Sequence, residues 1–195
     1  MGIEYERKFR ADREAILSVE KAVSGEKRRI TMQTVYYDTP DHILSANRCT
    51  LRKRLENGVS ICTLKTPSPT GGRSEYEVPC DTIESAIPIL CKLSGCAALL
   101  LAGTGVVPVC GAAFERTAIT FTYRGTQMEL ALDVGKLTGG GREAPLCEIE
   151  IELKDGSRTD VDAFSRQLAE KYGLTPEPKS KYARAKELKA EERHV

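Results

Sequence analysis

The sequence contains little histidine and no tryptophan. Only two of its 195 residues are histidines, His42 and His194, and aromatic residues make up 6%. A mechanism that depends on several histidines is therefore excluded. The charges are nearly balanced, with 29 Lys and Arg residues against 28 Asp and Glu residues. Because this balance creates no overall field that would attract nucleic acid or an anionic membrane, any anion site must be a local cluster.

Several common sequence signals are also missing. The chain does not open with a charged region followed by an apolar stretch, so we expect a cytoplasmic protein rather than a secreted one. The seven cysteines form no C-x-x-C pair, which argues against a zinc site and favours reduced, buried thiols. Neither a P-loop nor a G-x-S-x-G motif occurs, so these two kinds of active site are excluded.

One segment resembles a membrane span at first sight. No charged residue occurs between Leu93 and Phe114. Its strongly apolar part, Cys96–Ala102, is shorter than the roughly 20 residues that a spanning helix needs. We therefore predict a buried helical turn, a loop and a strand for the segment up to Ala113.

Alternation of apolar and polar residues dominates the rest of the chain and predicts about eight strands. They are Ile3–Phe9, Gln33–Tyr37, Thr50–Leu55, Ser60–Lys65, Arg73–Val78, Glu115–Thr122, Gln127–Asp133 and Cys147–Leu153. Helical periodicity occurs in Arg13–Val23, Ile83–Leu93, Val161–Tyr172 and Tyr182–Glu192. Thr82 and Asp160 are the expected N-caps, and Gly173 is an expected C-cap. Short turns at Asn57–Gly58 and Arg124–Gly125 indicate hairpins. The pattern predicts a mainly β (α+β) protein with one antiparallel sheet, open or closed into a barrel, and helices packed outside.

The polar face of these strands is unusually rich in charge. Glu4, Glu6 and Lys8 share one face of the first strand, and Arg52 and Arg54 share one face of the third. The last strand presents Glu148, Glu150 and Glu152 in the same way. Two interpretations are open. The charges form a solvated face, which is ordinary for an antiparallel sheet, or they point into an interior that binds a metal and an anion.

The available side chains favour one chemistry. With histidine scarce, the candidate ligands are carboxylate oxygens, which suit Mg²⁺ or Mn²⁺. Arginine and lysine suit phosphate oxygens. Together they indicate metal-assisted phosphoryl chemistry.

A series of motifs then carries a resemblance to a known family. In chain order they are Glu4–Tyr5–Glu6–Arg7–Lys8 (E-x-E-x-K), Tyr36–Tyr37–Asp38–Thr39–Pro40, Leu51–Arg52–Lys53–Arg54, Thr63–Leu64–Lys65, Glu75–Tyr76–Glu77, Glu115–Arg116, Ala131–Leu132–Asp133–Val134–Gly135, Cys147–Glu148–Ile149–Glu150–Ile151–Glu152–Leu153 and Ser180–Lys181. As an ordered set they resemble the CYTH superfamily, the triphosphate tunnel metalloenzymes. Within it, the sequence is most similar to bacterial inorganic triphosphatases, without the C-terminal CHAD domain that many of those carry.

The resemblance implies a fold and a set of roles. The expected fold is an eight-stranded antiparallel barrel that forms a tunnel, within a single domain at residues 1–188 and followed by a tail at 189–195. The expected phosphate-binding residues are Lys8, Arg52, Arg54, Lys65, Arg116 and Lys181. The expected ligands of Mg²⁺ or Mn²⁺ are Glu4, Glu6, Asp133, Glu148 and Glu150. Glu4, Glu6 and Lys8 are the expected catalytic residues. The residues expected to support these groups from behind are Glu75, Glu77, Glu152 and Arg73.

The resemblance also implies an activity, and several alternatives stay open. The first hypothesis is a metal-dependent hydrolase of inorganic triphosphate, a small-molecule substrate, acting as a monomer or homodimer with no nucleic-acid or membrane partner. The second keeps the enzyme and changes the substrate to thiamine triphosphate or a nucleoside triphosphate, or the reaction to cyclisation of ATP as in class IV adenylyl cyclases. The third is a polyphosphate-binding module without activity. The sequence shows no separate aromatic cluster for a base, which favours the inorganic substrate.

Overall fold

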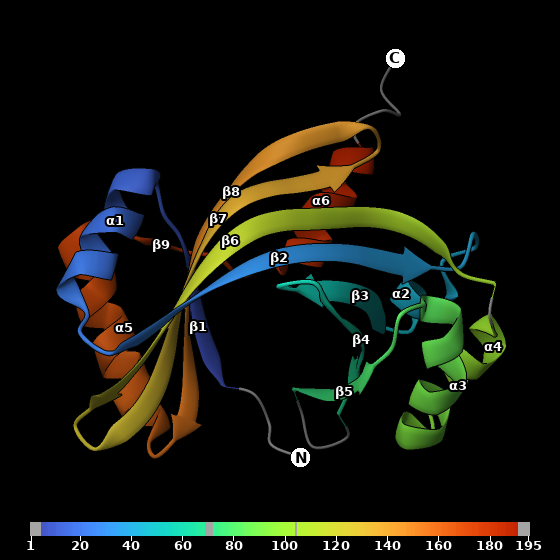
Figure 1. Cartoon of the computed structure of the whole chain (residues 1–195), viewed down its shortest axis with the longest axis horizontal. Coiled ribbons are helices and arrows are strands. Elements are labelled where there is room, and N and C mark those ends of the chain that lie inside the picture. Colours follow the sequence, from blue (N-terminus) through green and yellow to red (C-terminus); the bar gives the residue numbers. More distant parts are fainter. Residues whose placement is uncertain (1–4, 69–71, 104, 191–195) are drawn as a thin grey trace.

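The computed structural model describes residues 5–68, 72–103 and 105–190 and consists of one long curved sheet with helices on both of its faces (Figure 1). The strands are β1 (Glu6–Arg10), β2 (Glu26–Asp38), β3 (Thr50–Glu56), β4 (Val59–Pro67), β5 (Arg73–Pro79), β6 (Val107–Tyr123), β7 (Thr126–Gly139), β8 (Arg142–Asp155) and β9 (Thr175–Pro176). The helices are α1 (Arg13–Ala22), α2 (Ile43–Ala46), α3 (Ile83–Ser94), α4 (Ala97–Ala102), α5 (Arg158–Tyr172) and α6 (Lys181–Ala190).

The sheet is antiparallel, as predicted, but it is not a closed eight-stranded barrel. Within the described residues it has nine strands in the order β5-β4-β3-β2-β6-β7-β8-β1-β9. The edge of β1 that closure would require is paired with the short β9, and the Glu177 N–H donates to the Lys8 carbonyl just beyond it. Because the backbone groups on that edge of β1 already form hydrogen bonds, they are not available to pair with β5. The sheet therefore remains an open, strongly curved trough.

Two predicted hairpin turns are confirmed. Asn57 and Gly58 have φ values of +49° and +86°, and Arg124 and Gly125 have values of +53° and +83°. Positive φ at both central residues defines the turn type that matches the twist of antiparallel strands. These turns join β3 to β4 and β6 to β7.

The strands in the middle of the sheet are longer than the sequence predicted. β2 has 13 residues, whereas alternation indicated only Gln33–Tyr37. Its first half pairs with β6 from Glu26 onwards, although that stretch is a run of charged residues. Continuous pairing with a neighbouring strand therefore extends β2 beyond the part that alternation reveals.

The predicted helices are present, and one predicted cap is wrong. Thr82 caps α3 and Gly173 ends α5, as expected. The N-cap of α5 is Ser157 rather than Asp160, because the helix begins one turn earlier. Asp160 lies in the first turn and accepts a hydrogen bond from the Thr126 hydroxyl at 2.7 Å.

The apolar segment forms a short helix and a strand, as predicted. Cys96–Ala102 folds mainly as α4, which packs against α2 and α3, and β6 begins at Val107. In the part of the chain that the structure describes, we find no helix with the length and apolar character needed to cross a membrane.

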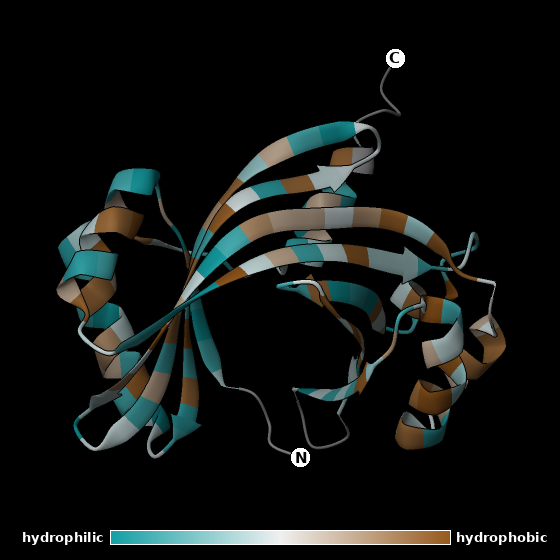
Figure 2. Ribbon diagram, in the orientation of Figure 1, coloured by the Kyte–Doolittle hydropathy of each residue, from teal (hydrophilic) through white to brown (hydrophobic). Residues whose placement is uncertain are grey.

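Two groups of helices cover the convex face of the sheet, where the brown apolar residues of Figure 2 meet the strands. Helices α1 and α5 cover one end, over buried residues that include Phe9, Leu130, Ile149 and Ile151. Helices α2, α3 and α4 cover the other end, over Leu51, Cys62 and Leu64. At these two ends, the apolar face of the strands packs on helices, which leaves the charged face to the concave side.

The prediction places helices outside the sheet, and one helix differs, because α6 packs on the concave side. Ala185 of α6 is fully buried in a third apolar cluster with Met32, Tyr36, Phe114 and Leu146. These apolar residues interrupt the charged face at one end of the trough. They provide the surface on which α6 docks, and the beginning of α6 thereby reaches the charged part of the concave face.

The approach of α6 to β7 depends on Gly139. A Cβ atom at this position would lie 2.1 Å from the Ala185 carbonyl oxygen. We expect Gly139→Ala to lower the free energy of unfolding by about 1–3 kcal/mol, because α6 would have to shift. Urea unfolding measures this effect. The matched control is Gly105→Ala, whose Cβ would meet only the Ala102 carbonyl oxygen at 3.5 Å. Equal changes in the two variants would contradict the packing argument.

Candidate functional site

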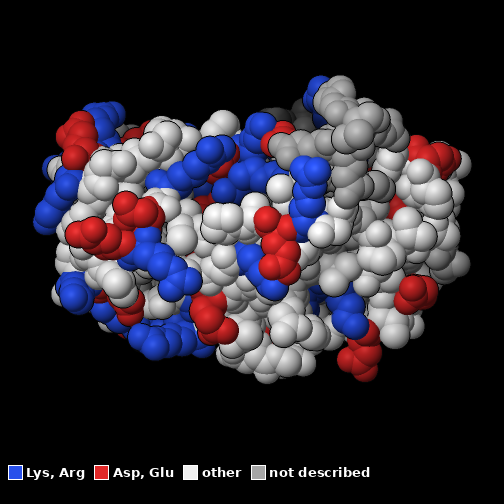
Figure 3. All heavy atoms as spheres, turned by 90° about the horizontal axis from the view of Figure 1, so that it is seen from above, with Lys and Arg blue, Asp and Glu red and all other residues white. Residues whose placement is uncertain are grey.

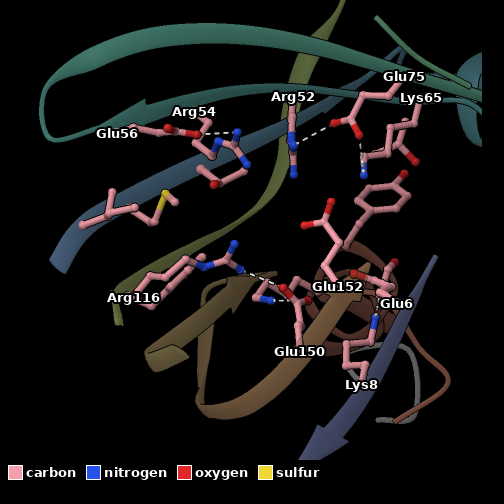
Figure 4. Close-up of a pocket in the computed structure, with 18 of the residues that line it drawn as sticks. Glu6, Lys8, Arg52, Arg54, Glu56, Lys65, Glu75, Arg116, Glu150 and Glu152 are labelled. Carbon is pink, nitrogen blue, oxygen red and sulfur yellow. Dashed lines mark hydrogen bonds and ion pairs between the residues drawn. The ribbon is translucent and has the colours of Figure 1, made fainter. Parts of the chain in front are cut away.

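The concave face forms a cavity of about 410 Å³ in which charged side chains predominate (Figure 4). Its lining consists of Glu6, Lys8, Arg28, Ile30, Met32, Thr34, Tyr36, Thr50, Arg52, Arg54, Glu56, Lys65, Arg73, Glu75, Glu77, Phe114, Arg116, Glu129, Glu150, Glu152, Lys154, Ser180, Lys181 and Tyr182. Charges of both signs also lie next to one another on the face seen from above (Figure 3). The charged residues of the cavity lining form two groups.

The first group is a basic wall, which we define as Arg52, Arg54 and Lys65. Alternation along β3 directs both arginines to the concave face, and the neighbouring β4 adds the lysine. Glu75 of β5 bridges two of these cations, with its carboxylate oxygens 3.1 Å from Arg52 Nη2 and 3.0 Å from Lys65 Nζ. Glu56 pairs with Arg54. The wall is thus partly neutralised by carboxylates at its edges.

The two arginines of the basic wall keep buried donor atoms that lack an acceptor among the described residues. Burial lowers the pKa of Arg54, and the nearby cations Arg52 and Arg116 lower it further. The Nε atoms of Arg52 and Arg54 are buried and have no hydrogen-bond partner within the described ranges. An anion in the cavity would supply acceptors for these two donors.

The second group is an acidic wall opposite the first, defined as Glu6, Glu129, Glu150 and Glu152. Three of these lie in one row across adjacent strands, because Glu152 of β8 pairs in register with Glu129 of β7 and with Glu6 of β1. Like charges directly opposite one another are unfavourable. Lys154 Nζ partly compensates at 2.7 Å from Glu152 and 3.7 Å from Glu129. In Figure 4, Glu152 extends from this wall into the space below Arg52.

Glu150 of the acidic wall also belongs to a cluster of three carboxylates, in which Asp133 and Glu148 lie buried behind the wall. Each offers one oxygen, and these oxygens lie within 4.8 Å of one another. Lys181 of α6 enters the cluster, with Nζ 2.8 Å from Asp133, 2.9 Å from Glu150 and in contact with Glu148. Arg116 binds Asp133 through two hydrogen bonds of 2.7 and 2.8 Å and reaches Glu150 at 2.7 Å. Arg184 also contacts Glu148, so three cations compensate the cluster.

Burial and pairing shift the ionisation of this cluster. Burial raises the pKa of Glu148 to about 7, against the opposing attraction of Lys181. Burial also acts to raise the pKa of Glu150, but Lys181 and Arg116 outweigh it, so that this pKa lies well below its usual range. Burial acts to lower the pKa of Lys181 and of Arg116, yet the neighbouring carboxylates raise the pKa of both. The two cations therefore stay charged beside Glu150.

The structure brings most of the predicted site residues together. All six predicted phosphate-binding residues line the cavity. Glu6 and Glu150 do so as well, whereas the side chains of Asp133 and Glu148 are fully buried behind the wall. Glu4 lies outside the described residues.

The four predicted supporting residues all line the cavity, but they contact different groups. Glu75 pairs closely with the basic wall, whereas Glu77 is 3.8 and 3.7 Å from Arg52 and Arg54 and accepts from the Thr63 hydroxyl. Glu152 is part of the cavity lining. Arg73 donates to the Arg48 carbonyl and the Thr50 hydroxyl, both at 3.0 Å, which ties it to the start of β3.

Sequence reasoning missed several residues of the site. Arg28, Glu129 and Lys154 line the cavity and form a series of ion pairs. Arg184 of α6 contacts Glu148 from the side opposite the cavity. Glu129 lies on the same face of its strand as Asp133, and Lys154 on the same face as Glu152, so alternation could have revealed both. The spacing of three residues after Lys181, on one face of a helix, was the signal for Arg184.

The fold and site define a class of proteins in which a curved antiparallel sheet carries facing basic and acidic walls on its concave side. The family model of the CYTH domain matches residues 2–185. The chain belongs to the CYTH domain family.

Similar proteins agree with this membership. The chain is 33% identical over 148 residues to the inorganic triphosphatase of Haemophilus influenzae, a match that covers 73% of this chain and 42% of that protein. It thus spans less than half the length of this curated relative.

Solved structures share the fold. HpAC1 from Hippeastrum, a candidate adenylyl cyclase with a dominant triphosphatase activity, has a TM-score of 0.67 at 18% identity, covering 98% of this chain and 97% of its own. A candidate adenylate cyclase from Bacillus halodurans has a TM-score of 0.61 at 19% identity, covering 91% and 94%. PH1819 from Pyrococcus horikoshii has a TM-score of 0.59 at 22% identity, covering 97% and 99%.

Proposed function

We propose that this protein is a triphosphatase that hydrolyses inorganic triphosphate to pyrophosphate and phosphate with the aid of Mg²⁺ or Mn²⁺. The observation that carries the proposal is the basic wall that faces an acidic wall across one cavity. The name of the Haemophilus relative, an inorganic triphosphatase, supports the same activity.

The basic side chains would hold the phosphate chain. Arg52, Arg54 and Lys65 lie on one side of the cavity, and Lys8, Arg116 and Lys181 lie on the other. Arginine offers paired donors that match phosphate oxygens, and lysine adds point charges. Binding would exchange the Glu75 carboxylate for phosphate oxygens at Arg52 and Lys65. A linear triphosphate held at several points is also oriented for reaction, which is a large part of catalysis in phosphoryl transfer.

The carboxylates fit a hard divalent cation, because every candidate ligand atom is an oxygen. Glu6, Glu150 and Glu152 would hold the ion at the cavity, and Asp133 and Glu148 would complete the carboxylate set behind them. The row of like charges from Glu129 to Glu6 supports this assignment, since a cation would relieve its repulsion. When bound, the ion supplies positive charge that stabilises the charge developing on the phosphate oxygens.

The reaction needs one water and breaks one phosphoanhydride bond. The water oxygen would bond to the terminal phosphorus, which becomes orthophosphate, while pyrophosphate leaves with the electrons of the broken bond. A proton of the water would pass to a carboxylate of the acidic wall and from there to solvent. Arg52, Arg54 and Lys65 would stabilise the charge that the pyrophosphate gains, because their positions are set before the reaction begins.

A phosphate-release assay tests the proposed function. Triphosphate, pyrophosphate, ATP and thiamine triphosphate are each supplied with Mg²⁺, with Mn²⁺ and with EDTA. We expect release of phosphate from triphosphate with either metal and none with EDTA. Binding of triphosphate without any turnover would instead support a polyphosphate-binding module.

We expect inorganic triphosphate to be preferred over ATP by at least about tenfold in kcat/KM, or about 1.4 kcal/mol. Among the apolar lining residues, Ile30 and Tyr182 are partly buried, and Met32, Tyr36 and Phe114 have exposed fractions of only 3%, 5% and 8%. Helix α6 packs on the last three, so they offer an adenine ring little area for stacking. ATP would gain less than triphosphate from the same contacts.

Competition kinetics with both substrates present checks this preference. An equal or greater kcat/KM for ATP or thiamine triphosphate would overturn the inorganic assignment. It would favour the nucleotide or thiamine alternatives instead.

A further inference from the structure

Lys181 is a cavity cation whose position depends on three carboxylates. Its ammonium group is a point charge on a flexible stem, so the surrounding carboxylates decide where it lies. Asp133, Glu148 and Glu150 all pair with its ammonium group, and of these three only Glu150 lines the cavity. A group that weakens the attraction of Asp133 or Glu148 for the ammonium would therefore shift the ammonium toward the cavity.

Arg184 and Lys181 share one of these carboxylates, Glu148. It follows Lys181 by three residues on α6, so both side chains leave the same face of the helix. Arg184 Nη2 contacts the second oxygen of Glu148, and Lys181 contacts the first. The Glu148 side chain is fully buried, so these two cations are its counter-charges within the described residues.

Arg184 is itself held from behind by Glu177. Its Nη1 lies 3.5 Å from the Glu177 carboxylate, whose side chain is fully buried. Glu177 also accepts from the Lys179 backbone N–H at 2.9 Å and pairs with Arg10. Alternating charges thus run from Arg10 through Glu177, Arg184 and Glu148 to Lys181. Arginine suits the middle of this series, because its planar fork serves two carboxylates at once.

We propose that Arg184 is a positioning residue for phosphate binding, which satisfies Glu148 and so keeps the Lys181 ammonium at the cavity wall. Without Arg184, Glu148 would have Lys181 as its main counter-charge and would draw it inward. The inference rests on the proposed function, because it assigns Lys181 to the phosphate chain.

The matched pair of variants is Arg184→Gln and Lys186→Gln. Both remove one positive charge from α6. Lys186 also tethers the helix, through a 2.9 Å hydrogen bond from its Nζ to the Ser45 hydroxyl, but it does not contact the carboxylate cluster. A loss of helix docking would affect both variants, whereas a loss of Lys181 positioning would affect only the first.

Two readouts separate positioning from stability. The first is steady-state hydrolysis of triphosphate with Mg²⁺, in which we expect Arg184→Gln to raise KM about tenfold with a smaller change in kcat. The second is the ¹⁵N NMR signal of the Lys181 ammonium group in the protein without substrate, assigned by its absence in Lys181→Met. We expect Arg184→Gln to shift this signal and Lys186→Gln to leave both readouts unchanged. In a Lys181→Met background, Arg184→Gln should add no further rise in KM.

Should Arg184→Gln not fold, Arg184→Lys provides the same test with the charge retained. A lysine cannot reach Glu148 and Glu177 together, so we expect a smaller rise in KM and a shifted Lys181 signal. An unchanged Lys181 signal in the folded variant, or equal effects of the changes at 184 and 186, would overturn the proposal. Absence of triphosphate hydrolysis by the wild-type protein would overturn the proposed function, and with it the phosphate-binding role. The NMR arm would then still show whether Arg184 sets the position of Lys181.

Discussion

Replacing Glu6 by Gln is expected to lower kcat for triphosphate hydrolysis at least about 100-fold. Loss of a group that only hydrogen-bonds to a metal ligand typically costs less than this, and Glu6 is proposed to be a ligand itself. The change removes one carboxylate from the row shared with Glu152 and keeps the size of the side chain. Because the Glu6 side chain is 33% exposed, its loss should leave the fold intact. Steady-state kinetics over a range of Mg²⁺ concentrations measures the effect.

The control for this result is Glu143→Gln on β8. Glu143 also carries one negative charge, but it pairs with Lys136 at 2.6 Å and lies outside the cavity lining. We expect near-normal kinetics for it. Near-normal activity of Glu6→Gln at limiting Mg²⁺ would contradict the placement of the metal at the acidic wall.

Replacing Arg54 by Met is expected to weaken triphosphate binding by about 1.5–3 kcal/mol, or roughly ten- to a hundredfold in Kd. The side chain contributes two or more charged donors to the basic wall, and a methionine of similar length contributes none. Burial and the neighbouring cations disfavour its charge, as the lowered pKa of Arg54 indicates. Removing it should therefore cost the fold little. Calorimetric titration with triphosphate in EDTA measures binding separately from turnover.

Lys53→Met is the matched control, since Lys53 precedes Arg54 on β3 and points to the opposite face, where it donates to the Asp81 carbonyl. We expect it to leave triphosphate affinity unchanged. Unaltered affinity in Arg54→Met, or equal losses in the two variants, would show that the basic wall does not hold the phosphates.

Local patterns were sufficient to predict the basic wall and all of the acidic wall except Glu129. Alternation along β3 places Arg52 and Arg54 on one face whatever the sheet does, because successive side chains of a strand point to opposite sides. The same holds for the glutamates of β8. Turn chemistry at Asn57–Gly58 likewise predicts its hairpin, since glycine and asparagine tolerate positive φ.

Which carboxylates meet one another could not be read from these patterns. The row from Glu129 through Glu152 to Glu6 depends on the registers of two strand pairs that join distant parts of the chain. A shift by one residue in either register would separate the charges. For the same reason, alternation did not reveal that Asp133 and Glu148 lie buried behind the cavity rather than in its lining.

The sequence by itself determined the alternating strands, their tight turns, the charged face and the motif order that resembles the CYTH family, because each depends on neighbours along the chain. Only the tertiary structure decided that the sheet stays open at β1 and β5, that α6 packs inside the trough, and that Arg184 reaches Glu148 behind Lys181. These features arise from β9 pairing with β1 and from α6 docking on Met32, Tyr36 and Phe114. They depend on contacts between segments far apart in sequence, and no local periodicity encodes such contacts.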